Sequence, residues 1–227
     1  MRVLAIDTAL AACSAAVLDT AYGGILASES LPMMRGHAEA LMPLVARVMK
    51  ASGMAFRDLD RVAVTTGPGS FTGLRVGISA ARGIALATGM PAVGVATLSA
   101  YAAPYLGADD KSPVIAAIDA RHDHVYLQVF APGGRTLIAP RLAALSEAVR
   151  AASDTAACLV GSAAQAVAAG LAKTAPPPVA VDARAAPDIA WVAQIGVVVP
   201  EATEPPKPQY LRAPDAQPQN AAQLPRR

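Results

Sequence analysis

The tripeptide Ala-Ile-Asp occurs twice in this chain, at residues 5–7 and 117–119, and each copy ends an apolar stretch typical of a strand. Each copy also leads into a short polar turn and a second stretch of strand character, at 14–18 and 125–130. Because the recurrence includes the structural setting as well as the residues, it favours an internal duplication over chance. We therefore predict a duplicated α/β fold with its boundary near residues 107–112.

Short apolar runs alternate with helical patterns along the rest of the chain, as expected for this architecture. Further strands are expected at 24–31, 62–66, 92–95 and 158–160, and helices at 38–49, 70–89, 146–152, 162–173 and 188–198. Pro43 predicts that the first of these helices starts late or kinks. We divide the chain into an N-terminal lobe (1–107), a C-terminal lobe (108–200) and a Pro-rich tail (201–227).

The composition indicates a folded protein without a strongly basic surface. Of 227 residues, 54% are hydrophobic, which is enough to build a buried core. Lys and Arg number 19 and Asp and Glu 17, so the net charge of +2 is too small to form a nucleic-acid footprint by itself. Any RNA substrate would have to be held mainly by a partner protein. Cys13 and Cys158 are flanked by apolar residues, which predicts buried, reduced thiols in a cytoplasmic protein.

Two apolar stretches resemble targeting or membrane segments. Residues 10–13 (LAAC) resemble a lipoprotein cleavage site, but Asp7 interrupts the short apolar stretch before them, so export is not expected. Residues 83–108 carry no charge, but Gly89 and Pro91 divide them into a helix end, a strand and a second helix. We expect a cytoplasmic protein with no membrane segment.

The strand at 62–66 ends in Gly67-Pro68-Gly69, after which Ser70 and Thr72 start a helix rich in small residues. Helix starts leave main-chain N–H groups unpaired, so this turn has the geometry of a phosphate or carboxylate site, although the same geometry joins ordinary α/β units. Local chemistry leaves both interpretations open. The weak cofactor-binding candidates lie in this turn and after the first strand: Asp7, Thr8, Gly67, Gly69, Ser70 and Thr72.

Two helices carry more apolar or small-residue surface than packing on their own sheet requires. The first has a wide apolar stripe, and in the second small residues recur every four positions, which would let another helix approach closely. We predict a docking surface for a partner with a similar helix pair; the alternative is that these helices are buried inside their own lobe. The predicted interface residues are Leu41, Leu44, Val45, Val48, Met49, Gly73, Arg75, Gly77, Ala81 and Arg82.

Six segments together resemble one known family. They are AIDTALAACSAAVL (5–18), GHAEALMPLV (36–45), TTGPGSFTGLRVG (65–77), AVGVATLSAY (92–101), AIDARHDHVY (117–126) and PQYLR (208–212). In this order they are similar to TsaB, the non-catalytic actin-like subunit of the bacterial machinery that makes threonylcarbamoyladenosine in tRNA. The resemblance implies the duplicated actin-like fold of sugar kinases and heat-shock ATPases, with two α/β lobes.

The resemblance also implies partners. They are the catalytic paralogue TsaD, the ATPase TsaE, a second copy of the chain in a homodimer when it is alone, and tRNA reached indirectly through the complex. The threonylcarbamoyl-adenylate substrate would come from a separate enzyme. No cofactor is expected on this chain alone, and the interface of the complex is the place left open for ATP or ADP.

The same resemblance implies that the chain does no chemistry itself. The catalytic paralogue ligates a metal with two histidines four residues apart, and the matching positions here are Thr97 and Tyr101, which are poor ligands. The turn at residues 9–13 has no glycine, so Cβ atoms stand where actin-like kinases bring backbone close to phosphate. His122 and His124 lie in a predicted hairpin turn, where we expect no metal. We expect no catalytic residue and no metal ligand.

In the tail, residues 208–212 match the family's Pro-x-Tyr-Leu-Arg. Tyr210 can bury its ring while its hydroxyl stays hydrogen-bonded, and Arg212 can pair with a carboxylate, so this piece is expected to dock while its flanks stay loose. The alternative is a disordered tail in which the motif makes no contact.

The expected function is therefore that of a scaffold subunit. It would bind and activate TsaD for threonylcarbamoyl transfer to the tRNA adenosine next to the anticodon. Two alternatives remain. The first is an enzyme, either a small actin-like kinase or a metallopeptidase, which would need a phosphate loop or a metal site. The second is a self-associating regulatory module that uses the same two helices.

Overall fold

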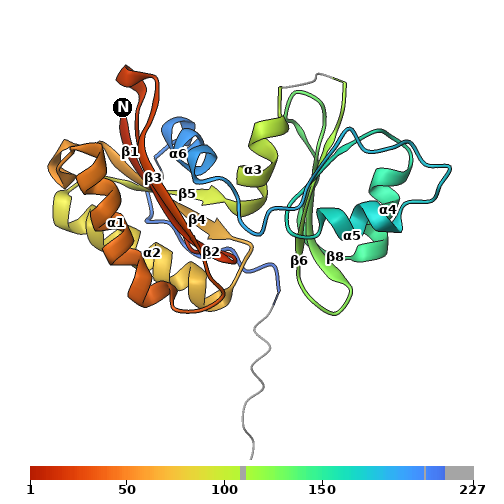
Figure 1. The fold of residues 1–227 in the computed structure, drawn as a ribbon, viewed down its shortest axis with the longest axis horizontal. Coiled ribbons are helices and arrows are strands. Elements are labelled where there is room, and N and C mark those ends of the chain that lie inside the picture. Colours follow the sequence, from red (N-terminus) through yellow and green to blue (C-terminus); the bar gives the residue numbers. More distant parts are fainter. Residues whose placement is uncertain (108–110, 202, 213–227) are drawn as a thin grey trace, which may run out of the picture.

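The computed structural model describes residues 1–107, 111–201 and 203–212, and it contains two five-stranded sheets with helices packed against them (Figure 1). The first half of the chain forms β1 (Arg2–Asp7), β2 (Ala12–Asp19), β3 (Gly24–Pro32), α1 (His37–Ser52), β4 (Arg61–Gly67), α2 (Phe71–Thr88), β5 (Ala92–Ala96) and α3 (Thr97–Ala102). The second half forms β6 (Val114–Asp119), β7 (His124–Phe130), β8 (Thr136–Ala144), α4 (Leu145–Ser153), β9 (Cys158–Val160), α5 (Ala164–Gly170), β10 (Ala180–Asp182) and α6 (Ile189–Val198).

The two sheets have the same topology. The first has the spatial order β3-β2-β1-β4-β5, and the second, read from its opposite edge, has the order β8-β7-β6-β9-β10. In each sheet the first three strands pair antiparallel and the last two join in parallel, through β1 with β4 and β6 with β9. This confirms the duplicated actin-like α/β fold that the sequence predicts.

The two Ala-Ile-Asp copies occupy equivalent places at the ends of the central strands β1 and β6. In both copies the aspartate accepts a hydrogen bond from the main-chain N–H two residues later. Asp7 Oδ1 lies 2.9 Å from the nitrogen of Ala9, and Asp119 Oδ1 lies 2.9 Å from the nitrogen of Arg121. The shared aspartate thus closes the same local turn twice.

The lobes exchange one helix each, which corrects the predicted lobe boundaries. α3 packs its Leu98 and Tyr101 against β6, in the second sheet, whereas α6 packs its Val192 and Ala193 on the inner face of the first sheet. In Figure 1 these two helices lie between the sheets, and α1, α2, α4 and α5 lie on the outer sides. The ranges 1–107 and 108–200 therefore assign each strand to its own sheet, but they place α3 and α6 in the lobe opposite to the sheet against which each one packs.

Four elements differ from expectation. β8 and β10 were not predicted; β8 contains Pro140, which lacks an N–H for the strand ladder and fits only because β8 is an edge strand. The late start predicted from Pro43 is wrong, since α1 begins at His37 and includes the proline. α5 covers residues 164–170 and is shorter than the expected 162–173.

Arg61 fixes the exchanged helix α6 to the first sheet. Its guanidinium is buried and donates through Nη1 to the carbonyl oxygens of Gly196 at 3.0 Å and Val199 at 2.8 Å. Its Nη2 pairs with the exposed Glu201 at 3.1 Å. A cation at a helix C-terminus interacts favourably with the helix dipole and with carbonyls that have no partner inside the helix.

We predict that Arg61→Ala lowers the free energy of unfolding by about 2–3 kcal/mol, because hydrogen bonds to a buried charged group are lost and two carbonyls are left unpaired. Urea denaturation followed by circular dichroism measures this. Arg57→Ala is the matched control, since Arg57 is exposed in the turn just before β4. Equal midpoints for the two variants would show that Arg61 does not hold α6.

Candidate functional site

The turn after β1 fills the start of α2. The Thr8 hydroxyl donates to the carbonyl of Gly73 at 2.7 Å, and the main-chain N–H of Ser70 donates to the carbonyl of Ala9 at 2.7 Å. The Ser70 hydroxyl in turn accepts from the N–H of Gly73 at 3.3 Å and so caps the helix. Two N–H groups that an anion would need are therefore already used.

The glycines of this region are required by that contact. A Cβ atom at Gly73 would lie 2.1 Å from the carbonyl oxygen of Thr8, and one at Gly77 would lie 2.4 Å from the Thr8 hydroxyl. At Gly69 the corresponding distance to the carbonyl oxygen of Ala9 is 2.4 Å. The small-residue ridge thus receives the chain's own turn, which corrects the prediction that it faces a partner helix.

The cofactor candidates do not form a phosphate cradle. Asp7 and Thr8 are buried, and Gly67 is the last residue of β4. Gly69 and the helix cap Ser70 line a cleft between the lobes, and Thr72 lines a groove between α1 and α2. The Thr8–Gly73 packing and the Ser70 cap use hydrogen-bonding groups that a phosphate bound at this turn would need.

The positions that would hold a metal in the catalytic paralogue are buried on α3. Tyr101 donates its hydroxyl to the carbonyl of Arg184 at 2.9 Å, and burial raises the pKa of this phenol. Thr97 is fully buried. Among the described residues no three His, Cys, Asp or Glu side chains come together as ligands would. These residues do not fit a metal centre.

Asp7 is fully buried at the end of β1. Its Oδ1 accepts from the Thr65 hydroxyl at 2.6 Å and from the N–H of Ala9, while Oδ2 is buried without a hydrogen-bond partner. Burial raises the pKa of this carboxyl, against the opposing effect of the two hydrogen bonds. A carboxyl held in this way supports the turn and is poorly suited to bind Mg²⁺.

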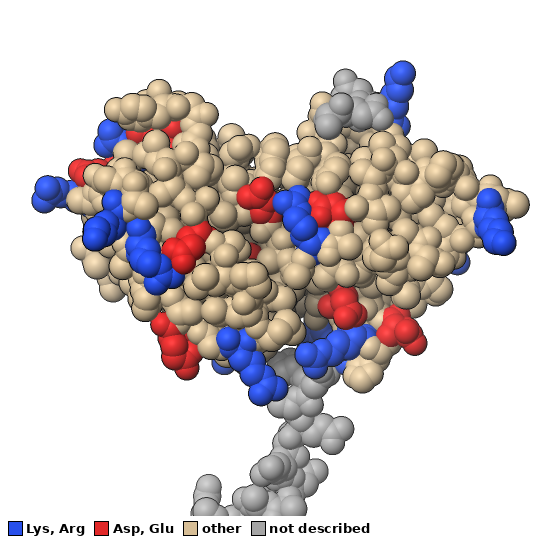
Figure 2. All heavy atoms as spheres, viewed as in Figure 1, with Lys and Arg blue, Asp and Glu red and all other residues tan. Residues whose placement is uncertain are grey.

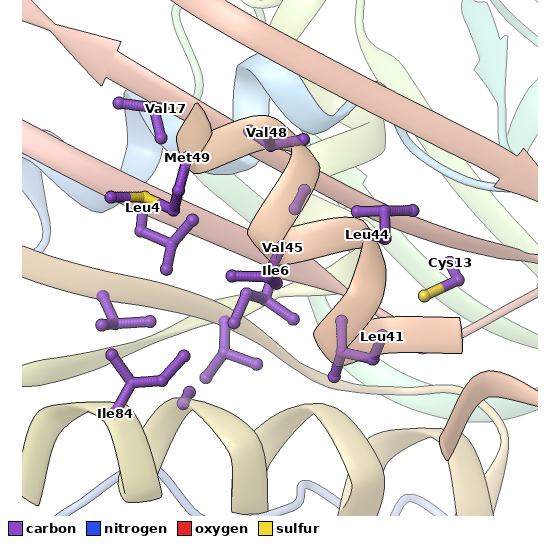
Figure 3. Close-up of a cluster of buried hydrophobic side chains, with 14 of the residues drawn as sticks. Leu4, Ile6, Cys13, Val17, Leu41, Leu44, Val45, Val48, Met49 and Ile84 are labelled. Atoms are coloured by element: carbon purple, nitrogen blue, oxygen red, sulfur yellow. The ribbon is translucent and has the colours of Figure 1, made fainter. Parts of the chain in front are cut away.

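Most of the predicted interface residues are buried in their own lobe, which corrects that assignment. Figure 3 shows side chains of α1 lying among Leu4, Ile6 and Val17 of the sheet. The buried members are Leu41, Leu44, Val45, Val48, Met49, Gly73, Gly77 and Ala81, and the exposed members are Arg75 and Arg82. The apolar stripe of α1 therefore packs in the core of its own lobe, which is the alternative that the sequence leaves open.

A different surface is open between the same two helices. This α1–α2 groove is lined by Ala38, Leu41, Met42, Phe71, Thr72, Arg75, Val76, Ser79 and Ala80. Met42 is 47% and Phe71 41% exposed, so the groove presents apolar side chains to solvent. Among the described residues neither Arg75 nor Arg82 forms an ion pair with a carboxylate. The sequence pattern missed Phe71, although an aromatic residue four positions before an arginine on one helix face is the signal for it.

The tail segment Pro206–Arg212, here called the strap, docks as predicted. The N–H of Gln209 donates to the carbonyl of Thr66 at 2.7 Å, and the Tyr210 ring stacks on Phe71 with centroids 5.1 Å apart. Arg212 donates to the main-chain carbonyl of Ala120 at 3.1 Å. Residues 213–227, which include the predicted loose flank, lie outside the described part of the chain.

The strap lines a cleft of about 570 Å³ between the lobes. Ser70 and His37 face it from the first lobe, Asp119 and Ser162 from the second. His122 and His124 are exposed in the β6–β7 turn beside it, where Nδ1 of His124 lies 2.6 Å from the carbonyl oxygen of His122. The aspartate turn of the second lobe therefore lines the cleft through Asp119, Ala120 and Arg121, whereas Asp7 of the first lobe does not reach it.

The distribution of charge and the hydrophobicity of the helices bear on nucleic-acid and membrane binding. On the face in Figure 2, Lys, Arg, Asp and Glu side chains are scattered and form no continuous basic patch. In the described residues, no helix combines the length and hydrophobicity that crossing a bilayer requires.

Comparisons with known proteins agree with the fold and the sequence resemblance. The family model described as "tRNA N6-adenosine threonylcarbamoyltransferase" (TsaD) matches residues 11–184. The tRNA threonylcarbamoyladenosine biosynthesis protein TsaB of Escherichia coli is 41% identical over 126 residues, which are 56% of this chain and 53% of that protein. TsaB of Haemophilus influenzae is 35% identical over 126 residues, 56% of this chain and 52% of that protein.

Among solved structures, YeaZ from Pseudomonas aeruginosa superposes with a TM-score of 0.71 and 29% identity, covering 92% of this chain and 99% of that one. The chain spans about half the length of the curated relatives it matches. The resemblance to TsaB inferred from the six segments is confirmed.

We predict that Gly73→Ala lowers the free energy of unfolding by about 1–3 kcal/mol or more, because the added methyl overlaps the Thr8 carbonyl. The matched control is Gly83→Ala on the exposed side of the same helix, where a Cβ meets no atom within 4 Å. That change should raise the free energy of unfolding by about 0.5–1 kcal/mol through helix propensity. Urea denaturation of both variants compares them, and a stable Gly73→Ala protein would show that the turn does not pack as described.

A second prediction concerns pH. The raised pKa of Asp7 means that the folded protein keeps a proton that the unfolded chain loses near the ordinary value of 3.8. The stability from this group is complete below that pH and is lost as pH rises toward the raised pKa. Asp7→Asn keeps an oxygen for Thr65 and Ala9, so its stability relative to the wild type should increase as pH rises from about 4 to 7. Denaturant titrations across this range measure the difference, and a constant difference would contradict a protonated Asp7.

Proposed function

Because the chain belongs to the tRNA N6-adenosine threonylcarbamoyltransferase family, we propose that it acts in forming threonylcarbamoyladenosine in tRNA, as a non-catalytic subunit that binds and activates TsaD. The observation that carries this proposal is the solvent-exposed α1–α2 groove on a lobe whose own phosphate and metal positions are filled by packing. TsaD would transfer the threonylcarbamoyl group, and this chain would supply the surface that holds TsaD in its active arrangement.

Two features support the absence of chemistry on this chain. The turn after β1, which actin-like kinases use to hold phosphate, has no glycine at residues 9–13 and packs against the start of α2. Thr97 and Tyr101 occupy the metal-ligand positions of the catalytic paralogue as buried side chains, and the Tyr101 hydroxyl is committed to a main-chain carbonyl. A kinase or a metallopeptidase would need one of these positions to be open.

The groove fits a helical partner that carries carboxylates. Met42, Phe71 and Val76 offer apolar contact, and Ser79 and Ala80 are small enough for close approach by a helix. Arg75 and Arg82 project from α2 a heptad apart without acidic partners among the described residues, so an acidic side chain on the incoming helix would be complementary to them. We propose that TsaD presents such a helix pair.

The same proposal covers the other components of the assembly. TsaE would join the TsaD complex, and a second copy of this chain would cover the groove when TsaD is absent. The tRNA would be held mainly by the partners, in the cytoplasm, since the net charge of this chain is only +2. Any ATP or ADP would bind at the interface of the complex and not in this chain alone.

We predict that Met42→Glu weakens binding to TsaD from the same cell about tenfold or more, because the carboxylate would be buried in an apolar contact without a partner. Leu137→Glu on β8 is the matched control, since the two apolar side chains are 47% and 49% exposed. Isothermal titration calorimetry with both variants gives the dissociation constants. Equal binding by both variants would move the interface away from the groove.

Replacement of the chromosomal copy tests the function itself. Cells that carry Met42→Glu should lose threonylcarbamoyladenosine from tRNA hydrolysates measured by mass spectrometry, whereas cells with Leu137→Glu should retain it. An unchanged level in cells lacking the chain altogether would exclude a role in this modification. Size-exclusion chromatography of the isolated chain separates the self-associating module from the TsaD scaffold, because Met42→Glu should abolish any dimer that uses the same groove.

A further inference from the structure

The strap contacts both lobes and crosses the opening of the cleft between them. Pro206 is buried against β5 near Gly94, and the N–H of Gln209 pairs with the last residues of β4. Four strap residues, 209–212, line the cleft, and Arg212 reaches the carbonyl of Ala120 in the second lobe. The strap therefore continues from α6 on the first sheet to the β6–β7 turn of the second.

One part of the strap is built into the α1–α2 groove. The Tyr210 ring stacks on Phe71 at an interplanar angle of 29°, and its hydroxyl accepts a hydrogen bond from Nε of Arg75 at 3.1 Å. The Arg75 guanidinium carbon also lies 3.9 Å from the centroid of the Phe71 ring. Phe71 and Arg75 line the groove, so Tyr210, which is 43% exposed, extends the same surface.

The other end of the strap holds a strained turn. Arg121, His122 and Asp123 follow Ala120 and all have left-handed backbone, with φ of 63°, 52° and 57°. Three consecutive non-glycine residues in this region are unusual and are kept only where surrounding contacts fix them. The hydrogen bond from Arg212 to Ala120 is one such contact, and the N–H of Leu145 bonding the carbonyl of Asp123 at 2.8 Å is another.

We propose that the strap couples the docking groove to closure of the two lobes. Only one residue separates Tyr210 from Arg212, and an extended chain spans at most about 3.6 Å per residue. The lobes cannot separate at the cleft unless the strap leaves the first lobe, where Gln209 and Tyr210 hold it, or Arg212 leaves Ala120. A partner that covers the aromatic cluster holds Tyr210 in place and thereby favours the closed cleft, and by linkage a closed cleft presents the complete surface to the partner.

The coupling deepens the proposed function and rests on it for the identity of the partner. The surface it defines is composite, made of α1, α2 and the strap, and the partner that fits it carries an apolar side chain for the aromatic pair and a carboxylate for Arg75. Tyr210 and Arg212 are positioning residues in this scheme, because neither touches a reacting group.

The isolated full-length chain tests the mechanical part of the proposal. Fluorophores on Arg57→Cys and Asp154→Cys, two exposed sites in different lobes, report the interlobe distance by single-molecule energy transfer, since the native Cys13 and Cys158 are buried. Tyr210→Ala, Phe71→Ala and Arg212→Ala should each raise the ratio of open to closed molecules about two- to tenfold, the range expected for losing one aromatic or charged hydrogen-bond contact. The Tyr210→Ala/Arg212→Ala double variant should match Arg212→Ala alone, because loss of the contact with Ala120 already breaks the link.

Two variants distinguish coupling from general damage. Lys207→Ala lies in the strap but its side chain pairs with Glu204, so it should leave the distance distribution unchanged. Tyr210→Phe keeps the ring and should retain most of the closure. Unchanged distances in Tyr210→Ala and Arg212→Ala, with folding intact by circular dichroism, would overturn the proposal even if the melting temperature falls.

A partner arm separates this proposal from the proposed function. Purified TsaD should shift the wild-type chain toward the closed state. Arg212→Ala, remote from the α1–α2 groove, should weaken TsaD binding by the factor by which it lowers the fraction of closed molecules. Failure of the wild-type chain to bind TsaD would count against the proposed function while the isolated-chain distances still decide the strap. Equal TsaD affinity for wild type and Arg212→Ala, despite opened lobes, would overturn the coupling.

Discussion

The contact on which the rest of the structure depends is the packing of the Thr8–Ala9 turn against the glycine face of α2. Main-chain and hydroxyl oxygens of the turn lie where Cβ atoms of Gly69, Gly73 and Gly77 would otherwise stand. This contact fixes the helix against the central strand and uses N–H groups at the helix start. One local interaction thus also determines which side of α2 faces solvent, which is the side that lines the groove.

The two sheets share a local turn as well as their strand order. The aspartate turns at the ends of β1 and β6 are retained because they close the chain reversal after each central strand. Asp7 is kept as a buried support, while Asp119 remains exposed beside the cleft. The surface available to a binding partner is formed by the sides of α1 and α2 that face away from the sheet and by the strap that packs against α2.

The sequence was sufficient to predict the topology, because the repeated strand-turn-strand units are local patterns with a clear period. It was not sufficient for β8, since Pro140 obscures a strand that tolerates it only at an edge. Apolar periodicity on α1 identified a face but not what covers that face, so Leu41 and Val45 were assigned to a partner when they belong to the core. The stacking of Tyr210 on Phe71 joins residues 139 positions apart, which no local pattern can indicate.

The helix exchange has a consequence for how the chain acquires its structure during synthesis. Residues 1–96 contain every strand of the first sheet, yet one face of that sheet is covered by Ile189–Val198. A chain that leaves the ribosome from its N-terminus exposes the valines and alanines of that face until roughly a hundred further residues have followed, including the whole second sheet. Over the same interval Arg61 has not yet met its hydrogen-bond acceptors, the carbonyl oxygens of Gly196 and Val199. The two lobes are therefore not successive folding units, and the nascent first lobe is a natural client for chaperones that bind exposed apolar strands.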